Sequence, residues 1–214
     1  MAARHTVVKI CGLTRMEDAR AARDAGADWL GFVVLGESPR CVTPEAVREI
    51  CATISGAIAV AVMVAPSPDE ALRLAGRADV DRIQLHRVDP AAWPAEFPMP
   101  VSFAVPVAED GSLTTALPPT QHLVMLDTAH PELAGGTGYA FPWETARVVA
   151  ATRPVLLAGG LDGDNVAAAI ETVRPFGVDA SSRLETTPGV KDAAKMRRFV
   201  AAVRACDERN EDRG

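Results

Sequence analysis

Eight short apolar runs, separated by segments with helical spacing, constrain the fold of this chain more than any other feature of its sequence. They are rich in Val, Ile and Leu, and most are continuous, which is typical of parallel strands buried on both faces. The runs cover residues 7–10, 29–34, 58–64, 82–85, 101–105, 123–126, 155–158 and 177–180. Eight strands with helices between them predict an α/β fold, a compact (β/α)8 TIM barrel.

The segments between the runs carry signals for helix starts. Thr14 with Glu17, and Ser67 with Glu70, have the spacing of a capping box, and Thr43 precedes a proline at the next helix start. We therefore expect all three hydroxyl side chains to cap helices.

Two connections lack a helical pattern. Residues 89–100 are rich in proline, and residues 108–121 show no helical spacing, so the outer helices there should be short or missing. No break in composition divides the chain, which predicts one domain over 1–214, with a core at about 6–206 and a polar tail at 207–214. A doubly wound open sheet is the rival fold, but the chain has no dinucleotide-type glycine fingerprint.

Composition narrows the class of protein. The net charge of −6 disfavours nucleic-acid binding, and no apolar stretch is long enough to span a membrane. The N-terminal residues show no apolar signal core, so we expect a cytoplasmic protein. Cys11, Cys41, Cys51 and Cys206 have no metal-type or redox-type spacing, which predicts free thiols, no metal and no cofactor.

In a barrel of this kind, chemistry takes place at the carboxyl ends of the strands. Cys11 ends the first predicted strand and precedes a helix start, where a partly exposed thiol would have a lowered pKa and could act as a base. The alternative, a buried cysteine that only closes the strand, stays equally open.

Asp127 ends the sixth predicted strand above an apolar floor, where desolvation would raise its pKa and suit it to proton donation. Its alternative is capping of the next loop.

Two loops could bind a phosphate. Gly159 and Gly160 follow the seventh predicted strand, and Ser181, Ser182 and Arg183 follow the eighth. Loops in these two positions form the recurrent phosphate site of such barrels, through backbone N–H groups and hydroxyl donors.

Five further residues complete the predicted site. Arg40 follows the second strand and could pair with a substrate carboxylate, although a surface salt bridge is the alternative. His86 could be a hydrogen-bonding wall residue, and Asp179 lies at the eighth strand end. Gly135 and Gly136 belong to a glycine-rich loop that could cover the site.

Motifs at most of these strand ends occur in the order of one known family. They are 9–14 (KICGLT), 31–33 (GFV), 38–40 (SPR), 84–86 (QLH), 126–128 (LDT), 135–138 (GGTG), 157–161 (LAGGL), 178–179 (VD), 181–182 (SS) and 188–192 (PGVKD). From about residue 8 to the last helix, the sequence resembles the phosphoribosylanthranilate isomerases of tryptophan biosynthesis.

The resemblance implies an Amadori rearrangement of N-(5-phosphoribosyl)anthranilate to 1-(2-carboxyphenylamino)-1-deoxyribulose 5-phosphate, without metal or cofactor. It implies that Asp127 protonates the ring oxygen, that Cys11 removes a proton from the ribose carbon beside the imine, and that Arg40 binds the anthranilate carboxylate. The two loops would hold the phosphate of this small-molecule substrate, in a monomer or a homodimer.

The sequence departs from the family pattern at several positions. Arg183 and Arg87 stand where glycine is usual, Ala65 stands where asparagine is frequent, and Phe103-Ala104 stands where Lys-Ala is frequent. Two other functions therefore stay open: an aldose–ketose isomerase acting on another amino-phosphosugar, of histidine-pathway or specialised metabolism, and a non-catalytic phosphosugar-binding protein.

Overall fold

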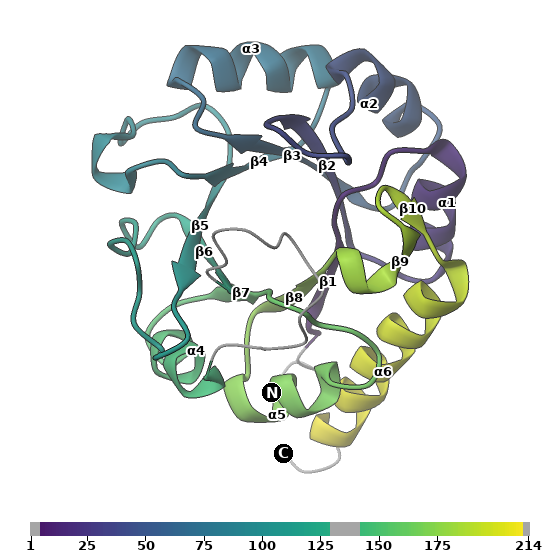
Figure 1. Cartoon of the computed structure of the whole chain (residues 1–214), viewed down its shortest axis with the longest axis vertical. Coiled ribbons are helices and arrows are strands. Elements are labelled where there is room, and N and C mark those ends of the chain that lie inside the picture. Colours follow the sequence, from purple (N-terminus) through teal and green to yellow (C-terminus); the bar gives the residue numbers. More distant parts are fainter. Residues whose placement is uncertain (1–4, 129–141, 212–214) are drawn as a thin grey trace.

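Eight parallel strands form a closed barrel in the computed structural model, which describes residues 5–128 and 142–211. Figure 1 looks into the ring of strands, with the helices on its outside. The strands are β1 (Val7–Ile10), β2 (Trp29–Leu35), β3 (Ile58–Val64), β4 (Arg82–His86), β5 (Val101–Val107), β6 (Leu123–Thr128), β7 (Val155–Leu157) and β8 (Gly177–Ala180). Each strand pairs with its neighbour in sequence, and β8 pairs with β1. The predicted fold is confirmed.

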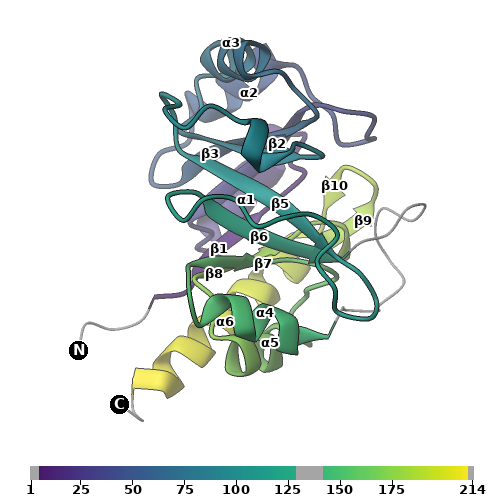
Figure 2. The ribbon, with the colours of Figure 1, turned by 90° about the vertical axis from the view of Figure 1, so that its left-hand side faces the viewer.

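The outer layer is incomplete, as the sequence predicted. The helices are α1 (Met16–Asp24), α2 (Pro44–Cys51), α3 (Pro68–Ala78), α4 (Trp143–Ala150), α5 (Val166–Val173) and α6 (Ala193–Glu211). Only a short 3-10 helix, η1 (Pro90–Ala92), lies between β4 and β5, and no helix lies between β5 and β6 within the fully described residues 108–122 (Figure 2). None of the helices in the described ranges combines the length and apolar character that a membrane span requires.

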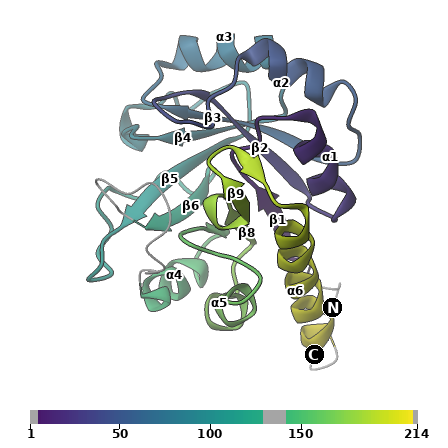
Figure 3. The same cartoon turned by 45° about the vertical axis from the view of Figure 1, so that its right-hand side comes forward.

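A small hairpin follows β8 and lies beside the barrel opening. It consists of the 3-10 helix η2 (Ser182–Leu184) and the antiparallel strands β9 (Glu185–Thr187) and β10 (Val190–Lys191) (Figures 1 and 3). This hairpin changes one predicted helix cap. Thr43 and Ser67 each cap a helix through a backbone N–H at 3.2 Å, but α1 begins after Arg15, and the Thr14 hydroxyl instead donates to the Gly189 carbonyl of the hairpin at 2.6 Å.

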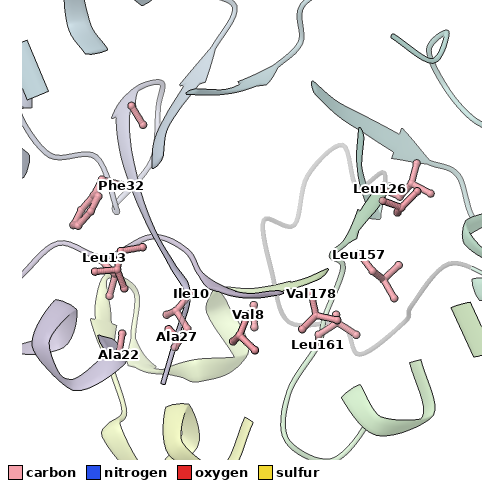
Figure 4. Close-up of a cluster of buried hydrophobic side chains, with 14 of the residues drawn as sticks. Val8, Ile10, Leu13, Ala22, Ala27, Phe32, Leu126, Leu157, Leu161 and Val178 are labelled. Atoms are coloured by element: carbon pink, nitrogen blue, oxygen red, sulfur yellow. The ribbon is translucent and has the colours of Figure 1, made fainter. Parts of the chain in front are cut away.

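The barrel strands lie between two apolar clusters, one outside the barrel and one inside it. Alternate side chains of each strand face one cluster or the other. Outward-facing side chains, such as Val8, Ile10 and Val178, pack against the helices (Figure 4). A smaller cluster fills the barrel interior and is formed by Trp29, Val60, Met125, Leu156 and Ala158. Because neighbouring side chains alternate along a strand, Lys9 and Cys11 face the interior, above this apolar floor.

Hydrogen bonds connect the last helix, α6, to Thr6, the residue that precedes β1. Near the end of α6, the buried Asp207 accepts hydrogen bonds from the Thr6 backbone N–H at 3.1 Å and the Thr6 hydroxyl at 2.6 Å. Arg204 donates to the Thr6 carbonyl at 2.8 Å. Residues 207–211, which the sequence analysis assigned to a polar tail, are therefore part of α6.

This attachment leads to a stability prediction. Replacing Asp207 with alanine leaves two buried donors of Thr6 without an acceptor, so the free energy of unfolding in urea should fall by about 1–3 kcal/mol. Glu208→Ala is the matched control, because Glu208 is an exposed carboxylate on the same helix. Equal unfolding midpoints for the two variants would contradict this account.

Candidate active site

The inward face of β1 carries a lysine and a cysteine at the barrel opening. Gly31 on β2, which has no side chain, leaves room for both. A Cβ atom at this position would lie 2.9 Å from the Cys11 Sγ and 3.0 Å from the Lys9 Nζ. The sulfur and the ammonium group therefore lie against the same point of the barrel wall, where any side chain on β2 would displace them.

Lys9 forms a buried ion pair with Asp179. The two residues are register partners on β1 and β8, and the Lys9 Nζ donates to Asp179 Oδ1 at 2.6 Å. Their side chains are 0% and 5% exposed. Burial alone would lower the pKa of Lys9, but Asp179 and Cys11 outweigh it and raise this pKa well above its usual value. The ammonium group is therefore charged inside the barrel.

Cys11 is buried rather than partly exposed. Its exposed fraction is 7%, and burial raises the pKa of the thiol above its usual value, although Lys9 opposes this through charge and a hydrogen bond. The prediction of a lowered thiol pKa is therefore wrong. Cys11 directly follows β1, and α1 begins only at Met16, so the thiol is not at the N-cap of that helix.

Asp127 ends β6 and has the raised pKa that the sequence predicted. Burial and the nearby Asp179 charge raise its pKa to about 6, against the opposing effects of the Thr128 backbone N–H and Lys9. That N–H donates to Asp127 Oδ1 at 2.8 Å. Lys9 and Asp179 act electrostatically on both Asp127 and Cys11, which lie at the carboxyl ends of β6 and β1, so one ion pair influences both the carboxyl and the thiol.

His86 lies at the end of β4 as a neutral side chain. The Gln84 side-chain amide donates to His86 Nε2 at 2.9 Å, and burial together with the Lys9 charge lowers the pKa of His86 to about 4. A neutral imidazole at this position is suited to hydrogen bonding, as expected of a wall residue.

Arg40 belongs to a buried charge network and not to a surface salt bridge. Its Nε and Nη2 donate to the two carboxylate oxygens of Glu185 at 2.8 and 2.7 Å. Lys191 of the hairpin donates to the same carboxylate at 2.8 Å and to the Ser181 carbonyl at 3.1 Å. Burial alone would raise the pKa of Glu185, but the hydrogen bonds from Arg40 and Lys191 hold it below its usual value.

Because Gly12 has no side chain, Arg40 of this charge network can pack against the residue that follows Cys11. Gly12 has a φ of +73°, and a Cβ atom there would lie 2.5 Å from Arg40 Cδ and 2.9 Å from Ser181 Oγ. Arg40 and the loop after β8 therefore meet directly above the residue that follows Cys11.

The two predicted phosphate loops lie side by side. Arg183, after β8, reaches toward Asp162, after β7, with 3.6 Å between Nη1 and Oδ2. Gly159 has a φ of +94°, and a Cβ atom there would collide with the Thr128 side chain and lie 3.1 Å from the Thr128 backbone nitrogen, whereas Gly160 faces open space. A cavity of about 300 Å³ adjoins these loops and is lined by Asp162, Asp164, Ser182, Arg183, Lys195 and Arg198.

At two departures from the family pattern the backbone conformation accounts for the family's usual residue and not for the residue of this chain. Ala65 and Arg87 have φ angles of +49° and +54°, in the left-handed region that favours asparagine and glycine. Phe103 is packed against Trp93 outside the barrel, with ring centroids 6.1 Å apart, so this departure does not face the site.

Sequence reasoning missed three charged residues of the site: Lys9, Glu185 and Lys191. A lysine within an apolar strand was the available signal for Lys9. The predicted residues Gly135 and Gly136 lie outside the described residues. Among the residues that the structure does describe, no three His, Cys, Asp or Glu side chains gather as a metal site would require.

Known proteins of one family are similar to this chain over most of its length. The profile of the family described as N-(5'phosphoribosyl)anthranilate (PRA) isomerase matches residues 8–202. The N-(5'-phosphoribosyl)anthranilate isomerase of Pelobacter propionicus is 41% identical, over 90% of this chain and 93% of its own length.

Solved structures extend the similarity to three dimensions. Phosphoribosyl anthranilate isomerase from Thermotoga maritima is 32% identical with a TM-score of 0.81, covering 94% of this chain and 100% of its own. A further such isomerase, solved with reduced 1-(o-carboxyphenylamino)-1-deoxyribulose 5-phosphate, is 29% identical with a TM-score of 0.77 over the same fractions of the two chains. The chain described here belongs to the N-(5'-phosphoribosyl)anthranilate isomerase family.

Proposed function

We propose that this chain converts N-(5'-phosphoribosyl)anthranilate to 1-(2-carboxyphenylamino)-1-deoxyribulose 5-phosphate. Family membership over residues 8–202 supports this reaction, as does the related enzyme solved with a reduced form of that ketose. The observation that carries the proposal is the pair of Cys11 and Asp127 around one buried ion pair, because an aldose–ketose rearrangement needs one proton donor and one proton acceptor.

The chemistry assigns a separate role to each group. Asp127, whose protonated form is favoured by burial, gives its proton to the ring oxygen while the nitrogen lone pair forms the C1–N double bond and the C1–O bond breaks. The Cys11 thiolate then takes the proton from C2, and the C2–H electrons form a C1–C2 double bond as the iminium nitrogen becomes neutral. Tautomerisation of this enol-amine gives the ketose.

The remaining predicted residues would hold the substrate. Gly159, Gly160, Ser181, Ser182 and Arg183 are assigned to the phosphate, because their loops adjoin one another after β7 and β8. Arg40 is assigned to the anthranilate carboxylate. Glu185 uses the Nε and Nη2 donors of that guanidinium, so Nη1 is the donor with no hydrogen bond to Glu185.

Removing either proton-transfer group should abolish most of the activity. Cys11→Ser and Asp127→Asn are each expected to lower kcat by about 10²–10⁴-fold, because neither a hydroxyl nor an amide can exchange the proton at neutral pH. Product formation by purified protein, followed by chromatography, measures this. Circular dichroism and urea unfolding check that both variants fold.

The choice of substrate is tested in the same assay. The unaltered protein is given N-(5'-phosphoribosyl)anthranilate and, in parallel, the aminoaldose phosphate of histidine synthesis. Turnover of the second compound alone would overturn the proposed substrate, and turnover of neither would overturn the proposed reaction.

The pH dependence of kcat/KM should show that the acid has a lower pKa than the base. The productive form needs a protonated Asp127, with a pKa of about 6, and a deprotonated Cys11, whose pKa lies above the usual thiol value. Below pH 6, kcat/KM should therefore rise with pH as thiolate forms. It should be level above about 6 and fall only beyond the thiol pKa. A single optimum centred below pH 6 would contradict these assignments.

Arg40 should affect binding more than the chemical step. Arg40→Lys removes the planar fork that can face both Glu185 and a substrate carboxylate, so KM should rise by about 10- to 150-fold, the equivalent of about 1.5–3 kcal/mol. The matched control is Arg77→Lys, because Arg77 forms an exposed ion pair with Glu45 on the outer helices. A KM equal to that of the control would remove Arg40 from the binding site.

A further inference from the structure

One buried charged group has no part in the proton transfers proposed above. Lys9 is fully buried on the inward face of β1, at a position where a barrel interior ordinarily holds an apolar side chain. Taking an ammonium ion out of water costs several kcal/mol, and a buried ion pair seldom improves on well-packed apolar side chains. Stability alone therefore does not account for a lysine at this position.

The position of Lys9 connects it to the thiol. Lys9 and Cys11 are two residues apart on one strand, so their side chains follow one another on the same face. Gly31 leaves the space in which both the Nζ and the Sγ lie, and Lys9 opposes the rise in the pKa of the thiol that burial causes. Asp179, at 2.6 Å, keeps the ammonium charged.

Other charged groups also act on the Cys11 sulfur, but Lys9 favours its ionisation most. Asp179 on β8 opposes ionisation of Cys11, Lys191 on β10 favours it, and Arg40 lies near enough to interact with the thiolate. Lys191 and Arg40 both direct hydrogen bonds to the Glu185 carboxylate. Of the cations on the described elements around the thiol, Lys9 has the largest favourable effect on its ionisation.

We propose that Lys9 is a positioning residue whose ammonium group lies beside the Cys11 sulfur and favours its ionisation to the anion that removes the substrate proton. In the proposed reaction Lys9 transfers no proton and acts mainly through the ionisation of Cys11, although its charge also lowers the pKa of Asp127. The catalytic part of this inference rests on the proposed isomerase function, whereas the effect of Lys9 on the thiol does not.

The test measures ionisation of Cys11 without any substrate. The full-length protein is alkylated with iodoacetamide at a series of pH values, and mass spectrometry of the Cys11 peptide gives the rate at each pH. In Lys9→Met the midpoint of this curve should move at least one pH unit higher than in the unaltered protein. Arg147→Met is the control, because it removes an exposed cation of α4 that pairs with Glu144 on the outside of the barrel, and its midpoint should not move. A Lys9→Met midpoint equal to that of the control overturns the proposal.

A second variant covers the case in which Lys9→Met does not fold. That single change leaves Asp179 buried without its partner, whereas Lys9→Met/Asp179→Asn removes both charges together. The attraction of Lys9 for the thiolate exceeds the repulsion from Asp179, so the midpoint of the double variant should also move to higher pH. An unchanged or lower midpoint in this folded variant overturns the proposal equally.

Kinetics then separate positioning from a general structural effect. In Lys9→Met the level region of kcat/KM should fall by up to about tenfold for each unit of thiol shift, and the alkaline limb should move to higher pH. A lower rate with an unmoved alkaline limb would show that Lys9 is only structural. Because the alkylation experiment uses no substrate, it decides the effect on the thiol even if the proposed reaction itself proves wrong.

Discussion

The ion pair between Lys9 and Asp179 is the interaction on which the rest of the site depends. It joins the first and the last strand of the barrel at the register position where β1 and β8 close the ring. Burial has the largest effect on the pKa values of Cys11, Asp127 and His86, and the two charges of this ion pair act on all three groups as well. One interaction therefore contributes both to closure of the fold and to the electrostatics of the site.

Three glycines, which have no side chain, are as important to this arrangement as the charged residues. Gly31 leaves the space that the sulfur and the ammonium occupy, Gly12 lets Arg40 and Ser181 approach the end of β1, and Gly159 lets the loop after β7 pack on Thr128. At all three positions a Cβ atom would come within 3.0 Å of a neighbouring atom. The convergence of the loops after β1, β2, β7 and β8 is thus built into the backbone and not only into the polar side chains.

The sequence predicted those parts of the protein that depend on local pattern. Continuous apolar runs placed all eight strands, because burial on both faces requires them, and Asp127 could be assigned a raised pKa because a carboxyl group above an apolar strand loses water. The cap of Thr14 and the partner of Arg40 could not be predicted, because both depend on the hairpin after β8, far away in sequence. Likewise, a local helix start suggested an activated thiol at Cys11, but burial in the barrel has the larger effect.

The charges at the opening explain how an acidic chain can admit an acidic ligand. The whole chain has a net charge of −6, yet the buried groups around Cys11 comprise three cations, Lys9, Arg40 and Lys191, against two anions, Asp179 and Glu185. Cys11 is largely neutral because its pKa is raised, and Asp127 adds a third negative charge only above its pKa of about 6. The opening therefore carries an excess of one positive charge below pH 6 and balanced charges at neutral pH, and in neither case does it share the negative charge of the whole chain. A phosphorylated carboxylate thus meets less repulsion at the opening than the overall charge suggests, and the Lys9 cation there also favours the thiolate that the proposed reaction requires.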